Sequence, residues 1–278
     1  MIDRINKWKI IPIQTGRFWL DGGAMMGTVP KVLWEKEHRP DGENRIELGL
    51  RVLLLDDGER RIIIETGLGN KFDKKFADMF SINQSPDPLY DALKKEGYSP
   101  DDITDVILTH LHFDHAGGAT REVGEAISPS FPNATYIISR SNWDAAISPS
   151  PRDRASYLME NFQPLMDSGV VRLVDDNERI YDSVLCYNVN GHTSGQQLII
   201  IGDKDETICF CSDLIPLRSH LRLPWIMGYD LNAELTLKEK KQFLDKAADN
   251  NWLLFFYHDP KYIAVKIKHG DRYYDISE

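Results

Sequence analysis

Short apolar runs in the first half of the chain predict β-strands. Residues 46–56 and 61–65 are rich in leucine and β-branched residues, and DGER between them is a turn signal, so together they predict a β-hairpin. Residues 87–98 have apolar side chains at helical spacing, with a glycine near the end. They predict a helix, and residues 101–110 then predict a strand that leads to His110.

Strand patterns also predominate in the second half. ATYIIS (134–139) predicts a strand, and residues 151–167 predict one or two helices. Four further strand candidates are residues 170–174, 184–189, 197–201 and 207–211. Residues 236–250 predict a helix capped by Thr236, and WLLFFYH (252–258) predicts a buried strand. Strands with interleaved helices favour the α/β (α+β) class, with two sheets covered by helices on their outer faces.

Composition adds limits on the fold and on partners. The chain has 278 residues, 42% of them hydrophobic and 27% charged, an ordinary globular balance. We find no internal repeat and no linker rich in proline or glycine, so residues 1–278 are expected to form a single domain. A net charge of −10 with no local basic patch disfavours nucleic acid as a partner. A small-molecule substrate is expected, in a protein that could form a homodimer.

The chain lacks the pattern of a secretory signal, and no stretch is long enough to span a bilayer. We therefore expect a cytoplasmic protein without membrane contact. Its three cysteines, Cys186, Cys209 and Cys211, are expected to be buried reduced thiols, with a metal site or redox pair as the alternative. Cys209 and Cys211 should share one face of a strand.

HLHFDH at residues 110–115 holds three imidazoles and a carboxylate within six positions. Along a strand, His110, His112 and Asp114 would project to one side, and His115 would need a change of direction. The motif therefore suits a strand end that turns into a loop. Neutral imidazoles with a carboxylate are a donor set that a divalent metal of intermediate softness prefers. A packing role is disfavoured because imidazoles so close together would repel on protonation.

Three more donors follow strand-like segments elsewhere in the chain: His192, Asp213 and His258. Side chains at the ends of several strands can meet at one edge of a sheet sandwich. Taken singly, such a histidine is more often hydrogen-bonded in a structural role, and such an aspartate more often caps a turn. Beside a metal-binding HLHFDH motif, however, all three become expected partners.

THLHFDHAGG, GHTSGQ, SDLIP and YHDP together resemble the metallo-β-lactamase superfamily in order and spacing, from about residue 46 to 268. The resemblance implies a four-layer αββα sandwich with a dinuclear centre. It implies one ion held by His110, His112 and His192, a second held by Asp114, His115 and His258, and Asp213 as the bridge between them. Zn²⁺ is the expected divalent ion, with Mn, Fe or Co as alternatives.

Residues 18–34 and 220–240 further resemble the quorum-quenching N-acyl homoserine lactonases and the related organophosphate hydrolases. This implies a metal-dependent hydrolase in which a hydroxide bridging the two metals cleaves an ester-like bond, foremost a lactone of the N-acyl homoserine lactone type. Asp114 and Asp213 are the expected catalytic carboxylates. Asp213 would orient the nucleophile and carry its proton to the leaving alkoxide.

Three positions depart from the family's pattern. Glu65 stands where the family usually has aspartate, and Gln196 where many relatives have histidine. Pro216 takes the place of a tyrosine found in the lactonases three residues after the bridging aspartate. Tyr229 is our candidate for a catalytic residue in the role of that tyrosine.

An apolar groove beside the metals would suit an acyl chain. Its candidate residues are Phe18, Trp19, Met25, Met26, Trp34, Trp225, Ile226, Met227 and Tyr229. The alternative, expected for most of them, is a place in the core or in a dimer contact. Arg218 and His220 are candidates for substrate contact, whereas His38 and His269 are expected at the surface.

Several other activities fit parts of the same pattern. A phosphotriester or aryl ester hydrolase is one alternative, and an iron-dependent oxidoreductase of the sulfur dioxygenase type is another, although that class uses one iron. His112 disfavours a diiron flavoprotein, which usually has glutamate there. The missing signal disfavours a secreted β-lactamase, and the short segment between Asp213 and His258 leaves no room for an inserted nuclease domain. A complete ligand set disfavours a non-catalytic scaffold.

Overall fold

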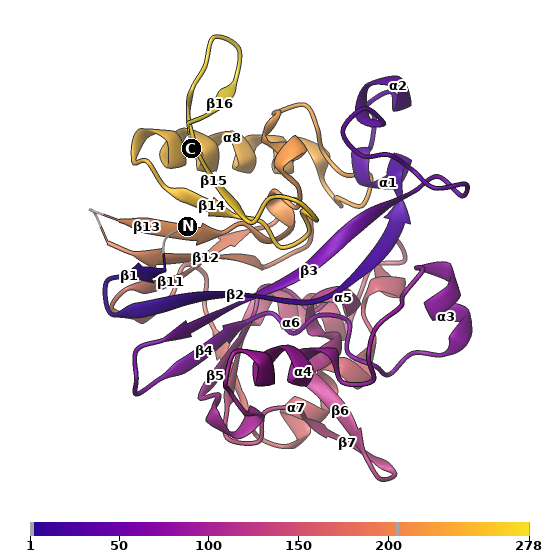
Figure 1. The fold of residues 1–278 in the computed structure, drawn as a ribbon, viewed down its shortest axis with the longest axis vertical. Coiled ribbons are helices and arrows are strands. Elements are labelled where there is room, and N and C mark those ends of the chain that lie inside the picture. The colour runs from indigo at the N-terminus through magenta and orange to yellow at the C-terminus, as the bar shows by residue number, and fades with distance from the viewer. Residues whose placement is uncertain (1–2, 204–205, 278) are drawn as a thin grey trace.

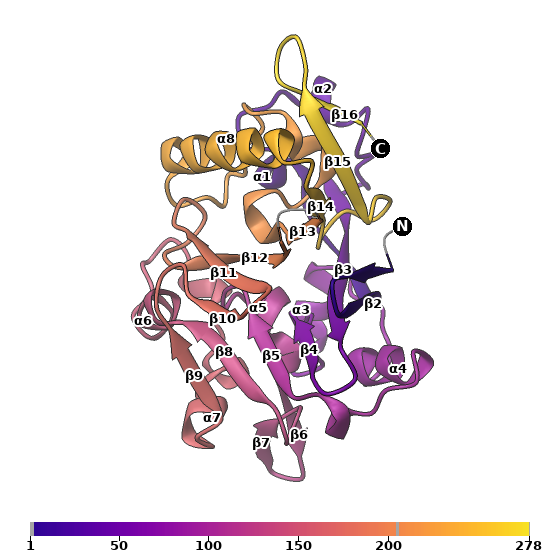
Figure 2. The same ribbon diagram turned by 90° about the vertical axis from the view of Figure 1, so that its left-hand side faces the viewer.

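The computed structural model describes residues 3–203 and 206–277, and in these residues two large mixed sheets face each other (Figure 1, Figure 2). The first sheet runs β1 (Arg4–Ile5), β2 (Trp8–Asp21), β3 (Arg45–Asp56), β4 (Arg61–Ile64), β5 (Asp105–Leu108), β8 (Thr135–Ser139) and β9 (Val171–Val174). The second runs β10 (Arg179–Tyr181), β11 (Val184–Val189), β12 (Gln196–Gly202), β13 (Thr207–Phe210), β14 (Leu253–Phe255), β15 (Ala264–His269) and β16 (Tyr274–Ile276). A small hairpin pairs β6 (Thr120–Val123) with β7 (Ala126–Pro129).

Helices cover the outer face of each sheet. The α-helices are α1 (Gly22–Met26), α2 (Lys31–Trp34), α3 (Lys74–Met79), α4 (Pro88–Lys95), α5 (Phe113–Ala116), α6 (Arg140–Ile147), α7 (Gln163–Asp167) and α8 (Ala233–Asp249). The 3₁₀ turns are η1 (Pro100–Asp102), η2 (Gly117–Ala119), η3 (Arg154–Ser156), η4 (Met159–Asn161), η5 (Ser212–Leu214) and η6 (Arg218–Leu221). Helix α8 packs on the second sheet, and α4 and α6 pack on the first (Figure 1). Every helix among the described residues is too short or too polar to span a bilayer.

The strand β13 shows how the layers are built. Its residues Ile208 and Phe210 point into the core between the sheets, whereas Cys209 and Cys211 point into a second core beneath α8. This alternation is the period-two pattern of a strand buried on both faces. The four-layer arrangement is therefore confirmed, as is the shared face of Cys209 and Cys211. These two thiols and Cys186 are free and buried.

Most of the predicted elements are present, although several are shorter than expected. The predicted hairpin is β3 with β4, paired antiparallel. The strand expected at 101–110 is reduced to β5 because η1 occupies its first residues. The helix expected at 87–98 is α4, and the strand expected at 252–258 is β14.

Two predictions about helices were wrong in detail. Helix α8 begins at Ala233, where Asn232 is the cap and accepts a hydrogen bond from the amide of Leu235. Thr236 lies inside the first turn and donates its hydroxyl to the carbonyl of Asn232 instead. The segment 151–167 forms two single 3₁₀ turns and then α7, and Pro164 lies in the first turn of α7, where a proline fits.

The sheet topology brings distant segments to one edge. Strands β13 and β14 are parallel, and two antiparallel steps through β12 give β11 the same direction as β13. The carboxyl ends of β11, β13 and β14 therefore lie at one edge of the second sheet. The chain leaves these ends toward the segments that contain His192, Asp213 and His258.

Two glycines let the turn after β5 pack against the turn after β4. The hydroxyl and the amide of Thr66 donate to the carbonyl of His115 at 2.7 and 3.0 Å. The amide of Gly118 donates to the carbonyl of Gly67 at 3.1 Å. A Cβ atom on Gly118 would lie 2.2 Å from the carbonyl oxygen of Thr66. A Cβ atom on Gly117 would lie 2.1 Å from the carbonyl oxygen of Leu68, so both glycines of the sequence motif are required by this backbone contact.

Gly118→Ala should destabilise the fold by about 1–3 kcal/mol, because the two turns must move apart to admit the methyl group. Urea unfolding measures this change. Gly42→Ala is the matched control, since a Cβ atom at Gly42 meets nothing within 4 Å, and it should alter stability by less than about 0.5 kcal/mol. Equal stability of the two variants would contradict the packing argument.

Candidate metal centre

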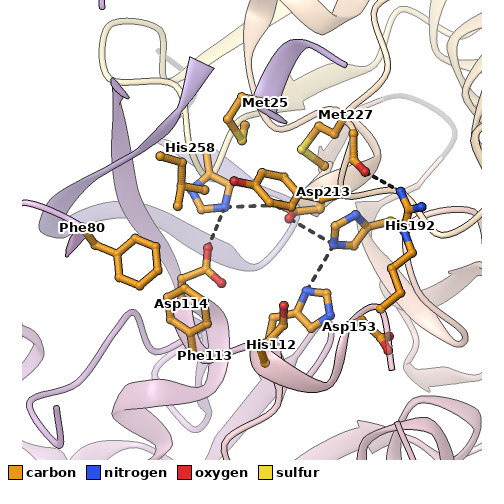
Figure 3. A pocket seen from close by; sticks show the side chains of 16 residues that line it. Met25, Phe80, His112, Phe113, Asp114, Asp153, His192, Asp213, Met227 and His258 are labelled. Carbon is orange, nitrogen blue, oxygen red and sulfur yellow. Dashed lines mark hydrogen bonds and ion pairs between the residues drawn. The ribbon is translucent and has the colours of Figure 1, made fainter. Parts of the chain in front are cut away.

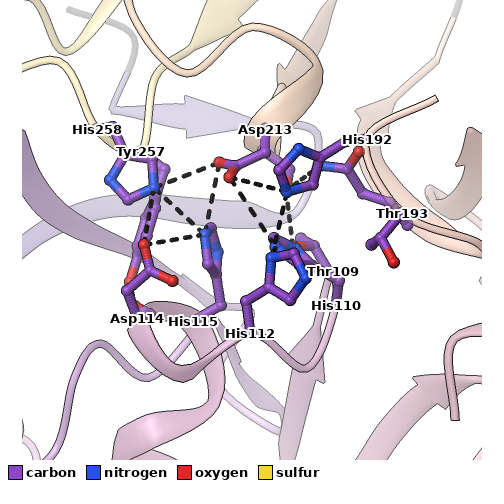
Figure 4. Close-up of polar contacts among 12 residues, drawn as sticks. Thr109, His110, His112, Asp114, His115, His192, Thr193, Asp213, Tyr257 and His258 are labelled. Atoms are coloured by element: carbon purple, nitrogen blue, oxygen red, sulfur yellow. Dashed lines mark hydrogen bonds and ion pairs between the residues drawn. The ribbon is translucent and has the colours of Figure 1, made fainter. Parts of the chain in front are cut away.

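The strand ends bring together all seven side chains that the sequence analysis selected as ligands (Figure 4). These are His110, His112, Asp114, His115, His192, Asp213 and His258, each at most 8% exposed. The strand β5 ends at Leu108, and α5 begins at Phe113. The motif is therefore a strand end followed by a short loop, as expected, but Asp114 and His115 lie in one helical turn.

Three histidines form the first cluster of donor atoms. His110 Nε2 lies 3.1 Å from His112 Nδ1, and His112 Nδ1 lies 3.2 Å from His192 Nε2. The rings meet nearly edge to face, so one nitrogen of each ring faces a common point.

The second cluster contains two histidines and one carboxylate. His258 Nε2 lies 3.2 Å from His115 Nε2 and 3.5 Å from Asp114 Oδ2. His115 Nε2 lies 3.8 Å from the same oxygen of Asp114.

Asp213 lies between the clusters and directs one oxygen to each (Figure 4). Its Oδ2 is 3.4 Å from His192 Nε2, and its Oδ1 is 3.3 Å from His258 Nε2 and 3.5 Å from His115 Nε2. The preceding residue, Ser212, has a φ of 46°, a conformation that side chains rarely adopt. This turn lets the chain leave β13 and aim Asp213 between the two sets of rings.

Hydrogen bonds at the outer ring nitrogens fix which nitrogen carries the proton. His258 Nδ1 donates to the carbonyl of Gly49 at 3.0 Å, and a carbonyl can only accept. His192 Nδ1 lies 2.8 Å from Asp230 Oδ1. For both rings, Nε2 therefore presents a lone pair to the cluster.

The outer nitrogens of two further histidines also lie beside polar groups. His115 Nδ1 lies 3.2 Å from Glu65 Oε1, without the geometry of a hydrogen bond. His110 Nδ1 lies 3.0 Å from the hydroxyl of Thr109, which itself donates to Glu65. Both rings can therefore carry their proton on Nδ1 and present the lone pair of Nε2 to the inside.

Lone pairs that face one another at these distances repel unless a cation lies between them. A tetrahedral ion with metal–nitrogen bonds of about 2.0–2.1 Å separates its donor atoms by roughly 3.3 Å, close to the separations in both clusters. Asp213 Oδ1, which faces His258 Nε2, is also buried without a hydrogen-bond partner among the described residues. Donor chemistry, spacing and this unpaired oxygen all fit a dinuclear centre for divalent cations.

The charge states of His110, His112 and Asp213 agree with that fit. Burial lowers the pKa of His110 and of His112 well below its usual value, and the neighbouring histidines lower it further. Both rings are therefore neutral near pH 7, as metal ligands must be. Burial raises the pKa of Asp213, but the neighbouring His115 and His258 hold it well below its usual range, so this carboxylate is ionised.

Glu65 and Gln196, two of the departures from the family pattern, contact a ligand candidate and a neighbour of one, respectively. Glu65 is buried, has a φ of 69°, and contacts His115 as described. Burial lowers the pKa of His115, but Asp213, Asp114 and Glu65 raise it well above its usual value. The carboxylates thus favour a positive charge at this position. Gln196 Nε2 donates to the hydroxyl of Ser212 at 3.0 Å, beside Asp213.

A cavity of about 490 Å³ opens beside the two clusters (Figure 3). Its lining includes Leu20, Met25, Phe80, Phe113, Met227 and Tyr229 on apolar parts, and Arg152, Asp153 and Ser156 on a polar part. The ligand candidates His112, Asp114, His192, Asp213 and His258 also line it, as do Ala155 and Gly228.

The sequence analysis found this lining only in part. Met25, Met227 and Tyr229 line the cavity as predicted. The other six candidates do not line it, in keeping with the alternative that most of them lie in the core: Phe18, Trp19, Met26, Trp34, Trp225 and Ile226. A pattern of large apolar residues does not distinguish core from cavity wall, and most of these six are buried in the core.

Predictions for three other side chains also need correction. His220 is buried away from the cavity, with Nε2 3.0 Å from the carbonyl of Met25. Arg218 lies over the ring of Tyr262, outside the cavity. His38 is half-buried rather than at the surface, with Nε2 2.9 Å from the hydroxyl of Ser219. His269 is exposed, as predicted.

Sequence reasoning missed Asp230, which holds His192, and the polar part of the cavity wall formed by Arg152 and Asp153. Asp230 lies 38 residues after His192, with no spacing that links them. Arg152 and Asp153 lie within residues 151–167, for which the sequence predicts helices. No signal in the sequence pointed to these residues.

The model of the family described as "Metallo-beta-lactamase superfamily" matches residues 51–258. The chain belongs to this superfamily. It is a metal-dependent hydrolase of that family, and its buried histidine and aspartate clusters are consistent with a dinuclear centre.

The chain is also similar to individual proteins of known structure or activity. The chain is 27% identical over 263 residues to an N-acyl homoserine lactonase of Bacillus cereus, covering 90% of this chain and 93% of that protein. It is similar to the crystal structure of a probable metal-dependent hydrolase from Staphylococcus aureus, with a TM-score of 0.89, 27% identity and 99% of each chain covered. It also shares its fold with AidC, a dizinc quorum-quenching lactonase (TM-score 0.81, 21% identity, 98% and 95% covered).

Proposed function

We propose that this hydrolase opens lactones of the N-acyl homoserine lactone type at a centre of two Zn²⁺ ions. The observation that carries the proposal is the position of Asp213, whose two oxygens approach the two donor clusters separately. One carboxylate that joins two clusters favours a dinuclear hydrolase over an oxygenase with one iron. The names of the lactonase relatives support the lactone as substrate.

The proposal assigns the ligands residue by residue. His110, His112 and His192 would hold one ion, Asp114, His115 and His258 the other, and Asp213 would bridge them. When bound, two divalent cations supply Lewis acidity and make water nucleophilic near neutral pH. Single-domain organisation and a homodimer remain predictions.

The chain's own residues would then handle the proton and the leaving group. Asp213, ionised and directed to both clusters, can accept the proton of the attacking water and return it to the leaving alkoxide. Asp114, which lines the cavity, can help to orient that water. Ring opening of a lactone gives a carboxylate and an alcohol that stay in one molecule. The cavity must therefore hold the whole molecule, including its acyl chain, while the ring opens.

The cavity fits such a substrate in size and character. A volume of about 490 Å³ lies within the range of small-molecule sites. Leu20, Met25, Phe80, Phe113 and Met227 offer apolar surface for an acyl chain. Tyr229 also lines the cavity and is 39% exposed. Burial and the charges of Asp21 and Asp114 raise the pKa of Tyr229 to about 12, so its hydroxyl keeps its proton and can donate.

His112→Ala should lose metal and activity together, because it removes one of three nitrogens from the first cluster. The wild-type protein should hold about two divalent ions per chain by elemental analysis, and the variant clearly fewer. His269→Ala, at an exposed histidine bonded to Asp249, is the matched control and should keep both. Full activity of His112→Ala would refute the assignment.

The same preparations should be assayed on lactones, aryl esters and phosphotriesters. The highest kcat/KM on N-acyl homoserine lactones is the expected result. A higher kcat/KM on aryl esters or phosphotriesters would contradict the lactone proposal and make that class the proposed substrate.

Tyr229→Phe should lower kcat/KM for lactone opening by roughly 10- to 100-fold, the effect of losing one hydrogen bond to a charged group. The metal content should not change, because Tyr229 is not among the proposed ligands. Tyr273→Phe is the control, since Tyr273 is similarly exposed (37%) but lies outside the cavity. If Tyr229→Phe matches wild type, Tyr229 has no catalytic role.

A further inference from the structure

The cavity has a polar part that the proposed mechanism does not use, and Asp153 lies there. In Figure 3, Asp153 is on the side of His192 and Phe80 is on the opposite side. Asp153 is only 8% exposed. Its Oδ1 accepts a hydrogen bond from the hydroxyl of Ser150 at 2.8 Å, and its Oδ2 has no hydrogen-bond partner among the described residues. One carboxylate oxygen is thus available to whatever fills the cavity.

No cation neutralises this carboxylate within the described parts of the chain. The guanidinium of the neighbouring Arg152 is directed away, since its Nη2 donates to the carbonyls of Gly228 at 2.6 Å and Asp230 at 3.3 Å. The free oxygen of Asp153 can therefore accept a hydrogen bond from a substrate that donates one in the cavity.

The segment that contains Asp153 is anchored to the first cluster. Tyr157, just after η3, places its ring 4.8 Å from the ring of His112. The hydroxyl of Tyr157 lies 2.6 Å from that of Thr193, next to His192. Asp153 therefore has a fixed position beside this cluster, whereas Phe80 lies on the side of Asp114 (Figure 3).

We infer that Asp153 is a specificity-determining residue, which accepts a hydrogen bond from an N–H group of the substrate. The inference rests on the proposed lactone opening and assigns the residue that recognises the amide of that substrate. Preferred lactones carry a secondary amide beside the ring carbonyl, with the N–H toward Asp153 and the acyl chain toward Phe80. Lactones without a donor at this position leave the carboxylate unpaired and react more slowly.

Asp153→Asn tests the inference with little change in shape. The backbone amide of Arg152 donates to the Ser150 hydroxyl at 3.2 Å, so this hydroxyl can use its own hydrogen for residue 153. An asparagine oxygen would keep that bond, and the amide NH₂ would then face the cavity. A donor would replace the free acceptor and oppose the N–H of the substrate.

The measurement compares two substrates, N-hexanoyl homoserine lactone and its analogue with CH₂ in place of N–H. Wild type should prefer the amide by roughly 10- to 100-fold in kcat/KM, and Asp153→Asn should reduce this ratio to about one or below. Asp144→Asn, the same change at an exposed position on α6, should keep the wild-type ratio. Zinc content and thermal unfolding of each variant identify any loss of structure. If Asp153→Asn fails to fold, the preference of the wild-type protein for the amide lactone over its CH₂ analogue tests the inference instead.

Each outcome separates the two proposals. Equal rates of wild type on both lactones, or an unchanged ratio in Asp153→Asn, would overturn the role of Asp153 and leave lactone opening intact. If wild type opens neither lactone, the proposed function fails, and the role of Asp153 fails with it.

Discussion

The structure depends on the convergence of imidazole lone pairs that repel one another unless cations lie between them. His192 and His258 illustrate the constraint, because Asp230 and the carbonyl of Gly49 hold their outer nitrogens and so turn the inner lone pairs toward the clusters. The sheets, turns and supporting carboxylates maintain this arrangement. Without cations the arrangement would be unfavourable, and the centre therefore couples metal binding to the stability of the fold.

Secondary structure brings these donors together through strand direction. Strands β11, β13 and β14 run the same way, so the segments after them reach one edge of the second sheet. The turn after β5 approaches that edge from the first sheet and is held by the close packing of Gly118 against Thr66. Rigid elements thus position the donors. The cavity beside them is lined partly by residues of turns and loops.

The donors were predictable from the sequence, whereas their supports were not. HLHFDH is a local motif, and His192, Asp213 and His258 each follow a recognisable strand, so residue type and position were informative. Asp230 and Asp153 depend on how distant segments pack, which no local pattern records. The cap of α8 was misplaced by four residues, to Thr236, because Asn232 and Thr236 both suit a helix start and only tertiary packing decides between them.

Crystallography of the zinc-loaded protein with anomalous scattering at the zinc edge tests the central claim most directly. The account predicts two peaks about 3.5–4 Å apart, one among His110, His112 and His192 and one among Asp114, His115 and His258, with Asp213 in contact with both. A single peak, or peaks away from these nitrogens, would contradict it.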